Sequence, residues 1–425
     1  MNSPRIGLVT REWPTSREDS GGIGTYFRNL AVGLSQCGAR PVVITGPAAE
    51  TEPDEPSYPF PVMHLPESTL GLARRLVERL YPETASYQAA AYHTALQRRD
   101  ALKRYLVPLI TQYGIEVLVG PLWGGELADL TKHTGLPVVL RASGLMRYIV
   151  RANGDPLDRH GRRLDQLEQR ALNSCAALYA PSSVALRELL DCINTPNVPH
   201  PVIPSGVDCD LFTPAHTLPA PRCRLLFVGR LEPQKGMTLL TTILPTVLDR
   251  SRIADFWFVG RDTPTAPDGG TWQDYLLDAC PQRLSRRCRF WGRLPWSGMP
   301  EIYRRCAALL VPSTRDRFPN AALEAMACRL PVIASAGAGL AEIIQPGHNG
   351  LIIPDRSPGA WAEALCALAA TPRQTRQLGH GARSYVEQHL SLTAAAEPVI
   401  ELCRQAVRRR TTRGVPTDSL EGLPA

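Results

Sequence analysis

Short apolar runs alternate with longer amphipathic stretches along the chain, and this alternation indicates its architecture. The apolar runs fall at Arg5–Thr10, Pro41–Thr45, Ile115–Gly120, Pro137–Arg141, Ala177–Pro181, Cys223–Gly229, Phe256–Gly260, Arg289–Gly292, Ala307–Pro312 and Pro331–Ser335. Apolar runs of this length, bounded by polar turns and helices, favour buried strands of parallel sheets. The pattern predicts an α/β protein built from βαβ units.

Helical spacing separates these strands. Apolar residues at positions 23, 27, 30, 31 and 34 line one helical face, which ends near Cys37 and Gly38. Further helices are predicted over about 70–113, 125–133, 158–175, 357–370, 372–390 and 393–410. Residues 46–69 are rich in Pro, Glu and Ser and predict a surface loop.

Chain length predicts two domains. A chain of 425 residues is too long for one hydrophobic core, and the segment 194–200, with Pro196 and Pro199, has the composition of a linker. We therefore place one Rossmann-like domain at 1–197 and a second at 198–390. A last helix follows over 391–410, and the tail over 411–425 is predicted to be disordered.

Composition narrows the classes of function. The 47 Lys and Arg exceed the 40 Asp and Glu by 7 charges, an excess too mild and dispersed for nucleic acid but compatible with phosphate-bearing ligands. The 11 cysteines lack metal-site spacing, and the chain has neither a signal core nor an apolar run of about 18 residues. We therefore expect a cytoplasmic protein. Basic residues within 70–113 leave open peripheral contact with an anionic membrane surface, against a merely solvated face.

The stretch 314–328 carries the strongest functional signal. It follows the apolar run Ala307–Pro312, so its polar residues lie at the carboxyl end of a predicted strand, where open α/β sheets bind ligands. Pro319 suits the first turn of a helix. The free N–H groups of the next three residues, Asn320, Ala321 and Ala322, then form a phosphate site.

Two carboxylates, Asp316 and Glu324, bracket this turn. Their spacing corresponds to about two helical turns once the non-helical start is discounted, so both can border one pocket. An ordinary turn with exposed acids is the alternative interpretation.

Two other turns are candidate phosphate sites. Arg230 ends a strand and Lys235 precedes a helix, so a guanidinium fork and an ammonium can converge on a diphosphate. Gly22 and Gly24 open the first helix, where missing Cβ atoms let a phosphate approach backbone N–H groups. A surface ion pair and a tight turn are the alternatives.

Two of these motifs resemble a known family. The acids of Asp316–Cys328, beside Phe-Pro-Asn and Leu-Glu-Ala-Met-Ala-Cys, resemble the signature of the retaining glycosyltransferases of family 4, and Gly229–Gly236 resembles its Gly-Arg-Leu-x-x-x-Lys-Gly motif. The resemblance implies the GT-B fold, in which two Rossmann-like parallel-sheet domains face each other across a cleft and the last helix crosses back to the N-terminal domain. It implies a hexosyltransferase-type enzyme that moves a sugar from a nucleoside-diphosphate sugar to a hydroxyl acceptor on a glycan, lipid-linked or small-molecule glycoside. No metal and no cofactor is expected.

The same resemblance implies roles for individual residues. Asp316 orients the donor sugar, and Arg230 and Lys235 hold its phosphates as the other catalytic residues. The donor-binding residues are Gly22, Gly24, Arg293, Leu294, Phe318, Pro319, Asn320, Ala321 and Glu324. Within this set Glu324 holds the ribose, and the turn at Arg293 meets the base. Ser143 lies on the acceptor side.

Three positions depart from the family pattern. Asp316 stands where the family has Glu, Arg329 where it has Gly, and Ser143 where many members have His. A serine cannot carry a proton as histidine does, so Ser143 would position the substrate through its hydroxyl group. The departures at Asp316 and Ser143 keep open a non-catalytic GT-B subunit that binds a nucleotide sugar. A nucleotide-sugar 2-epimerase is a second alternative, because such enzymes also have the GT-B fold.

Overall fold

The computed structural model describes residues 3–14, 21–46, 57–66, 87–152, 155–191, 198–215, 223–252, 254–313, 316–354 and 357–412. These residues form two units, and each unit is described by itself. The first comprises the residues up to Pro204 together with those from Ala395 onward, and the second comprises Ser205–Ala394. Three predicted segments lie wholly or partly outside the described residues: part of the loop over 46–69, positions 70–86 of the helical region over 70–113, and the tail beyond 412.

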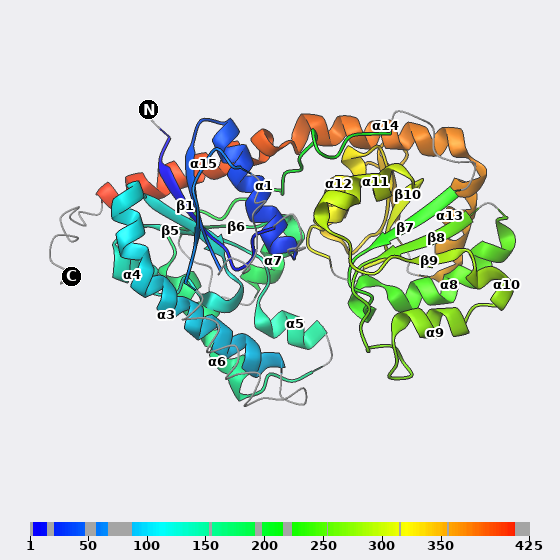
Figure 1. Ribbon diagram of the computed structural model, residues 1–425, viewed down its shortest axis with the longest axis horizontal. Helices are drawn as coiled ribbons and strands as arrows, with labels where there is room; N and C mark the ends of the chain where they lie inside the picture. Colours follow the sequence, from blue (N-terminus) through cyan, green and yellow to red (C-terminus); the bar gives the residue numbers. More distant parts are fainter. Residues whose placement is uncertain are drawn as a thin grey trace. The chain divides into compact units, whose positions relative to one another are not determined.

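A parallel sheet of six described strands forms the centre of the first unit, in the order β3-β2-β1-β4-β5-β6. Figure 1 labels β1, β5 and β6 of this sheet. The strands are β1 (Arg5–Val9), β2 (Arg40–Thr45), β3 (Val62–His64), β4 (Val117–Pro121), β5 (Val138–Arg141) and β6 (Ala177–Tyr179). In β1, Leu8 lies opposite Val43 of β2 and Val119 of β4. The chain therefore begins in the middle of the sheet and winds outward in both directions.

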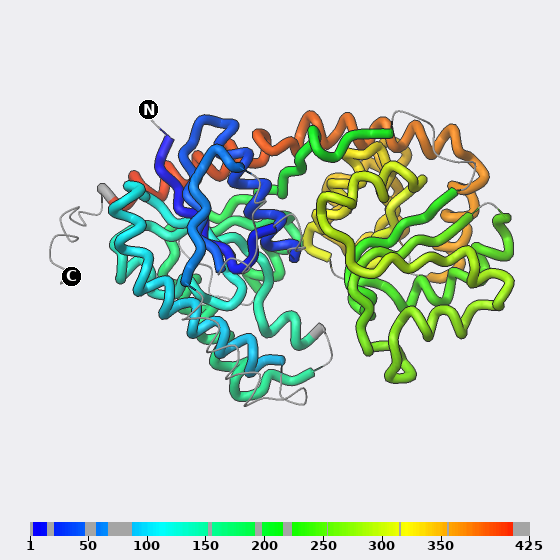
Figure 2. The backbone as a smooth tube through the Cα atoms, in the orientation of Figure 1, coloured from blue at the N-terminus to red at the C-terminus, as the bar shows by residue number. Residues whose placement is uncertain are grey.

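Alternate side chains of β1 enter opposite apolar layers, as the two-residue period of a strand requires. Ile6 and Leu8 pack with α1 (Gly22–Gln36) and α15 (Leu392–Thr412). Val9 packs instead in the layer that contains α3 (Tyr87–Tyr113) and α6 (Arg159–Ser174). Figure 2 traces the chain from blue β1 to red α15, which returns to complete this unit.

Shorter helices complete the first unit. They are α4 (Leu130–Thr134), α5 (Met146–Ala152) and α7 (Ser183–Leu190). The helix predicted over 125–133 was wrong in extent, because Gly125 and Asp129 have φ angles of 59° and 65° that no α-helix continues through. The helix predicted over 158–175 is confirmed as α6, and the Asp158 side chain caps it by accepting two backbone N–H groups at 2.7 Å.

A second parallel sheet of six described strands forms the centre of the other unit, in the order β12-β11-β10-β7-β8-β9. The strands are β7 (Cys223–Val228), β8 (Ala254–Val259), β9 (Cys288–Phe290), β10 (Ala308–Val311), β11 (Val332–Ser335) and β12 (Gly350–Ile353). All the strands predicted in this span are confirmed. The central strands are covered on both faces, whereas the edge strand β9 exposes Arg289.

Helices cover both faces of the second sheet (Figure 1). They are α8 (Met237–Arg250), α9 (Trp272–Asp278), α10 (Gln282–Ser285), α11 (Met299–Arg304), α12 (Asn320–Ala327), α13 (Pro358–Ala370) and α14 (Pro372–His389). One apolar layer contains α8 and α13, and the other contains α11, α12 and α14. The last helix, α15, continues to Thr412, two residues into the predicted tail.

α12 ends in a left-handed residue. The N–H of Leu330 donates to Ala325 O at 2.9 Å and that of Arg329 to Met326 O at 3.0 Å, a pair of bonds that forms a Schellman motif. Arg329 occupies the position of this motif that favours glycine, and its φ is 63°.

Among the described helices, none combines the length and apolarity that a membrane span requires.

Candidate active site

The candidate active site lies at the carboxyl ends of β7 and β10. β7 pairs with β8 on one side and with β10 on the other. The connection after β7 leads to α8 and that after β10 leads to α12, and these helices pack on opposite faces of the sheet. Such a divergence is a topological switch point, the place where doubly wound sheets bind ligands.

Two residues predicted as catalytic, Lys235 and Asp316, meet at this switch point. Lys235 Nζ donates to Asp316 Oδ2 at 2.7 Å, and the side chains are 31% and 12% exposed. The lysine follows β7 and the aspartate follows β10, so the pair joins the two diverging loops. An ammonium group has three donor hydrogens, so Lys235 can contact a ligand oxygen while it holds Asp316.

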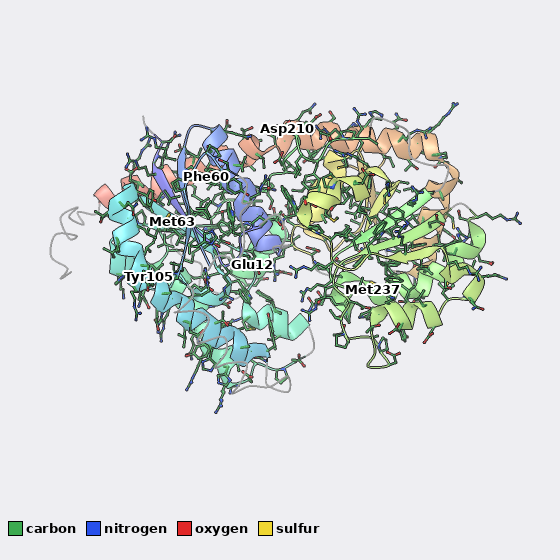
Figure 3. All side chains as sticks on the ribbon, viewed as in Figure 1. Glu12, Phe60, Met63, Tyr105, Asp210 and Met237 are labelled. Atoms are coloured by element: carbon green, nitrogen blue, oxygen red, sulfur yellow. The ribbon has the colours of Figure 1, made fainter. Side chains whose placement is uncertain are left out.

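Gly236 makes this contact possible. Its φ is 90°, and a Cβ at this position would lie 2.4 Å from the carbonyl oxygen of Pro312, just after β10. A side chain there would push the two loops apart. Met237, which opens α8 directly after this glycine, is labelled in Figure 3.

Asp316 is fixed from further sides. The N–H of Gly339, in the turn after β11, donates to the backbone carbonyl of Asp316 at 2.7 Å. The hydroxyl of Ser313 lies 3.5 Å from the same carboxylate oxygen that Lys235 contacts. Loops from three strands therefore hold the position of this acid.

Arg230 is at the same edge of the sheet but has a different partner. Its guanidinium contacts Glu232 Oε1 at 3.1 Å, and its side chain is 64% exposed. Because exposed ion pairs contribute little stability, this pair leaves the arginine able to exchange Glu232 for a ligand anion.

The start of α12 differs in two respects from the sequence-based expectation, which placed Pro319 in the first helical turn and left the N–H of Ala322 free. Pro319 precedes the helix as its N-cap residue, and Asn320 and Ala321 begin it with half-buried side chains. The N–H of Ala322 is not free, because it donates to Pro319 O at 3.1 Å. Phe318 is buried in the apolar layer beneath, which anchors this turn.

Glu324 faces a buried tyrosine. Tyr303, on α11, donates its hydroxyl hydrogen to Glu324 Oε2 at 2.7 Å, and Glu324 is 6% exposed. Burial, followed by the neighbouring Glu324 charge, raises the pKa of Tyr303 well above its ordinary value, so the phenol keeps its proton.

Arg293 and Leu294 follow the edge strand β9. Arg293 is exposed, whereas Leu294 is half-buried against the core. The preceding residue, Gly292, accepts a hydrogen bond from Gly260 N at 2.8 Å, so this turn is tied to the end of β8.

The remaining predicted residues belong to the first unit. Gly22 and Gly24 form the first turn of α1, where Gly22 is exposed and Gly24 is buried. Ser143 follows β5, and its hydroxyl oxygen accepts the N–H of Trp123 at 3.2 Å. Ser143 is thereby joined to the turn after β4.

Sequence reasoning missed several residues of these sites. Ser313 directly follows a predicted strand, a position that signals a site residue in open sheets. Glu232 lies within the Gly-Arg-Leu motif as an acid beside Arg230. Tyr303 lies on a separate helix, and nothing in its local sequence pairs it with Glu324.

Comparison with known proteins identifies the family and the fold. The chain matches the family model described as Glycosyltransferase Family 4 over residues 20–211 and that described as Glycosyl transferases group 1 over residues 222–371. The fold is similar to that of a sucrose-phosphate synthase from Thermosynechococcus elongatus, with a TM-score of 0.73, 22% identity and coverage of 96% of this chain and 100% of the other. It is also similar to HepE of Anabaena in complex with UDP and glucose, with a TM-score of 0.64, 16% identity and coverage of 94% and 98%.

Two doubly wound units of this kind form the GT-B fold. More narrowly, the chain belongs to the group 1 glycosyltransferases of family 4. Curated relatives include a D-inositol 3-phosphate glycosyltransferase of Kineococcus radiotolerans, 27% identical with 92% of each chain covered. A protein of the same name from Corynebacterium glutamicum is 25% identical, with 93% of this chain and 94% of the relative covered.

Proposed function

We propose that this enzyme transfers a sugar from a nucleoside-diphosphate sugar to an acceptor hydroxyl and retains the anomeric configuration. The observation that carries the proposal is the Lys235–Asp316 pair at the switch point of the second sheet. In this pair, the ammonium group that would stabilise the departing diphosphate lies directly beside the carboxylate that would contact the donor sugar. The relatives named for D-inositol 3-phosphate and the HepE complex with UDP and glucose support a nucleotide-sugar donor and a hydroxyl acceptor.

The departing diphosphate needs its developing charge stabilised, and preorganised cations achieve this without reorganisation. Lys235 and Arg230 supply these cations in the proposed mechanism. Asp316 would stabilise positive charge at the anomeric carbon while it holds Lys235 in place. Glu324, oriented by Tyr303, would accept hydrogen bonds from the ribose hydroxyls.

We also propose that the reaction needs no divalent ion. The described residues contain no group of three or more His, Cys, Asp or Glu side chains arranged for a metal, and the carboxylate of Asp316 is already paired with Lys235. Activity should survive excess EDTA, and loss of activity that magnesium restores would contradict this part of the proposal.

Peripheral contact with an anionic membrane, at the cytoplasmic face, is a further part of the proposal. The exposed face of α6 carries Arg159, Arg162, Arg163 and Arg170, whereas both acids of this helix point inward and are buried. Such a face attracts anionic lipids by about 1 kcal/mol per basic residue. Sedimentation with anionic but not neutral vesicles would support it, and equal sedimentation with both would oppose it.

The test of the main proposal is turnover of nucleoside-diphosphate sugars with hydroxyl acceptors, followed by release of the nucleoside diphosphate and by NMR of the product anomer. Lys235→Ala should weaken donor binding about tenfold or more, because a charge-assisted phosphate contact contributes roughly 1.5–3 kcal/mol. Arg250→Ala, an exposed change on the same unit, is the control. Unchanged kinetics for Lys235→Ala would contradict the assignment of Lys235 to the donor phosphates.

The same experiment separates the alternatives. An epimerase would alter the sugar without an acceptor, and a non-catalytic subunit would bind the nucleotide sugar without releasing nucleotide. An inverted product anomer would overturn the retaining assignment alone.

A further inference from the structure

The first unit has its own switch point, at the carboxyl ends of β1 and β4. β1 pairs with β2 on one side and β4 on the other. Arg11 follows β1, and Trp123 and Glu126 follow β4. Arg98 reaches the same place from α3, because it donates to the backbone carbonyl of Thr10 at 2.8 Å. We call Arg11, Arg98, Trp123 and Glu126 the β1–β4 cluster.

Two cations in the β1–β4 cluster share one carboxylate. Arg98 Nε donates to Glu126 Oε2 at 2.8 Å, and Arg11 Nε donates to Glu126 Oε1. Side-chain exposure is 4% for Arg98, 1% for Glu126 and 14% for Arg11. The cluster therefore keeps one positive charge in excess in a place with little access to water, which is unfavourable unless a further anion is present.

The nearest other acids do not cancel this charge at neutral pH. Glu168 is buried, and burial raises its pKa to about 8 even though it accepts the backbone N–H groups of Gly124 and Met146. It is therefore mostly protonated at pH 7. Glu12, labelled in Figure 3, is exposed, so water screens its charge.

Two hydrogen-bond donors of the cluster also lack acceptors. Arg11 Nη2 and Trp123 Nε1 are buried and have no hydrogen-bond partner within the part of the chain that the structure describes. They lie together, since the guanidinium carbon of Arg11 stands 4.2 Å from the centre of the Trp123 ring. Buried donors are nearly always satisfied in native proteins, so unsatisfied ones indicate an absent ion, water or ligand group.

We propose that the β1–β4 cluster binds one anionic group of the acceptor, a phosphate or a carboxylate. Excess charge, two adjacent unsatisfied donors and a switch-point position all favour the same type of ligand. Ser143, which accepts the backbone N–H of Trp123, lies next to this group and connects it to the predicted acceptor side. The assignment to the acceptor rests on the proposed function, whereas the anion site itself does not.

The direct test follows the indole N–H signal of Trp123 by NMR, assigned with Trp123→Phe. Inorganic phosphate and acetate are added separately to the full-length protein, with sodium chloride at matched ionic strength as the reference. We expect a saturable shift of this signal with phosphate or acetate, and the more effective anion identifies the acceptor's group. No shift beyond that of chloride with either anion overturns the proposal, whether or not any variant folds.

Variants then locate the site and its role. Arg11→Gln should abolish the Trp123 response, whereas Arg104→Gln, the same charge change at an exposed position of α3, should leave it intact. With an acceptor that supports turnover, Arg11→Gln should raise the KM of the anionic form about tenfold to 100-fold and leave the KM of its neutral counterpart unchanged. Equal effects on both forms would overturn the assignment to the acceptor.

Release of nucleoside diphosphate is measured in the same samples. A Trp123 response without turnover would leave the anion site standing and the proposed function failed. Turnover without a response of the Trp123 signal would support the proposed function and overturn the anion site.

Discussion

Asp316 is one methylene shorter than the glutamate that family 4 has at this position, yet it makes a 2.7 Å contact with Lys235. Backbone bonds explain how the shorter side chain is placed, since Gly339 N holds its carbonyl oxygen at 2.7 Å. A longer side chain at the same backbone position would have to displace the ammonium group. The aspartate is therefore matched to the loop that carries it in this chain.

Asp316→Asn should lower kcat about 100-fold while donor Kd changes much less, because the charge acts mainly in the transition state. Asp316→Glu should crowd the donor sugar and restore nothing. The measurements are kcat and donor Kd for both variants beside wild type. Full kcat in Asp316→Asn would show that the carboxylate has no part in catalysis and serves only as a structural partner of Lys235.

Glu168 makes stability depend on pH. An ordinary glutamate ionises near 4.5, whereas burial raises the pKa of Glu168 in the folded protein to about 8. Between these values the folded state binds more protons than the unfolded state, so this residue lowers the unfolding free energy as pH rises and its effect levels off above about 8.

Glu168→Gln should remove this dependence. The unfolding free energy of wild type minus that of the variant should fall between about pH 5 and 8, by up to about 1.4 kcal/mol per pH unit. Urea unfolding of both proteins across this range measures the difference. A constant difference would show that Glu168 is ionised throughout.

At the scale of elements, the apolar runs predicted strands well because both faces of each sheet are covered, which leaves little ambiguity in a short Val- and Leu-rich segment. The helix predicted over 125–133 failed because the left-handed residues Gly125 and Asp129 interrupt it. Gly and Asp adopt this conformation more readily than most residues, but both also occur inside helices, so their presence alone does not predict the break. Arg230, Lys235 and Asp316 each follow a predicted parallel strand, and the sequence therefore predicted that they lie together at the carboxyl edge of the sheet. The bond between Glu324 and Tyr303 depends on how α11 packs against α12, which local sequence does not record.

Arg329 offers a test of one helix end. It is an exposed residue with φ 63° in the Schellman motif after α12, where a side chain is strained. Arg329→Gly should raise the unfolding free energy by about 1 kcal/mol, whereas Arg329→Ala should not, because alanine keeps the strain. Urea unfolding compares the three proteins, and equal stability of the glycine and alanine variants would contradict the assignment.

At the scale of the whole molecule, α15 belongs to the core of the first unit although it is the last described helix. Val399 and Cys403 are fully buried among side chains of β1 and α1. Val399→Asp should destabilise the first unit by about 3 kcal/mol or more, since it buries an unpaired charge. Glu401→Ala, an exposed change on the same helix, should have little effect. Thermal unfolding of both variants distinguishes them.

The return of α15 has a consequence for synthesis on the ribosome. The apolar face formed by β1 and α1 emerges early, but the residues that cover it, from Ala396 to Ala406, are translated only after the entire second unit. At about 5–20 residues per second, the intervening segment leaves this face without its helix for tens of seconds. The first unit to be made is therefore the last to be finished, and a nascent chain that stalls before residue 396 would expose this face to aggregation and to chaperones.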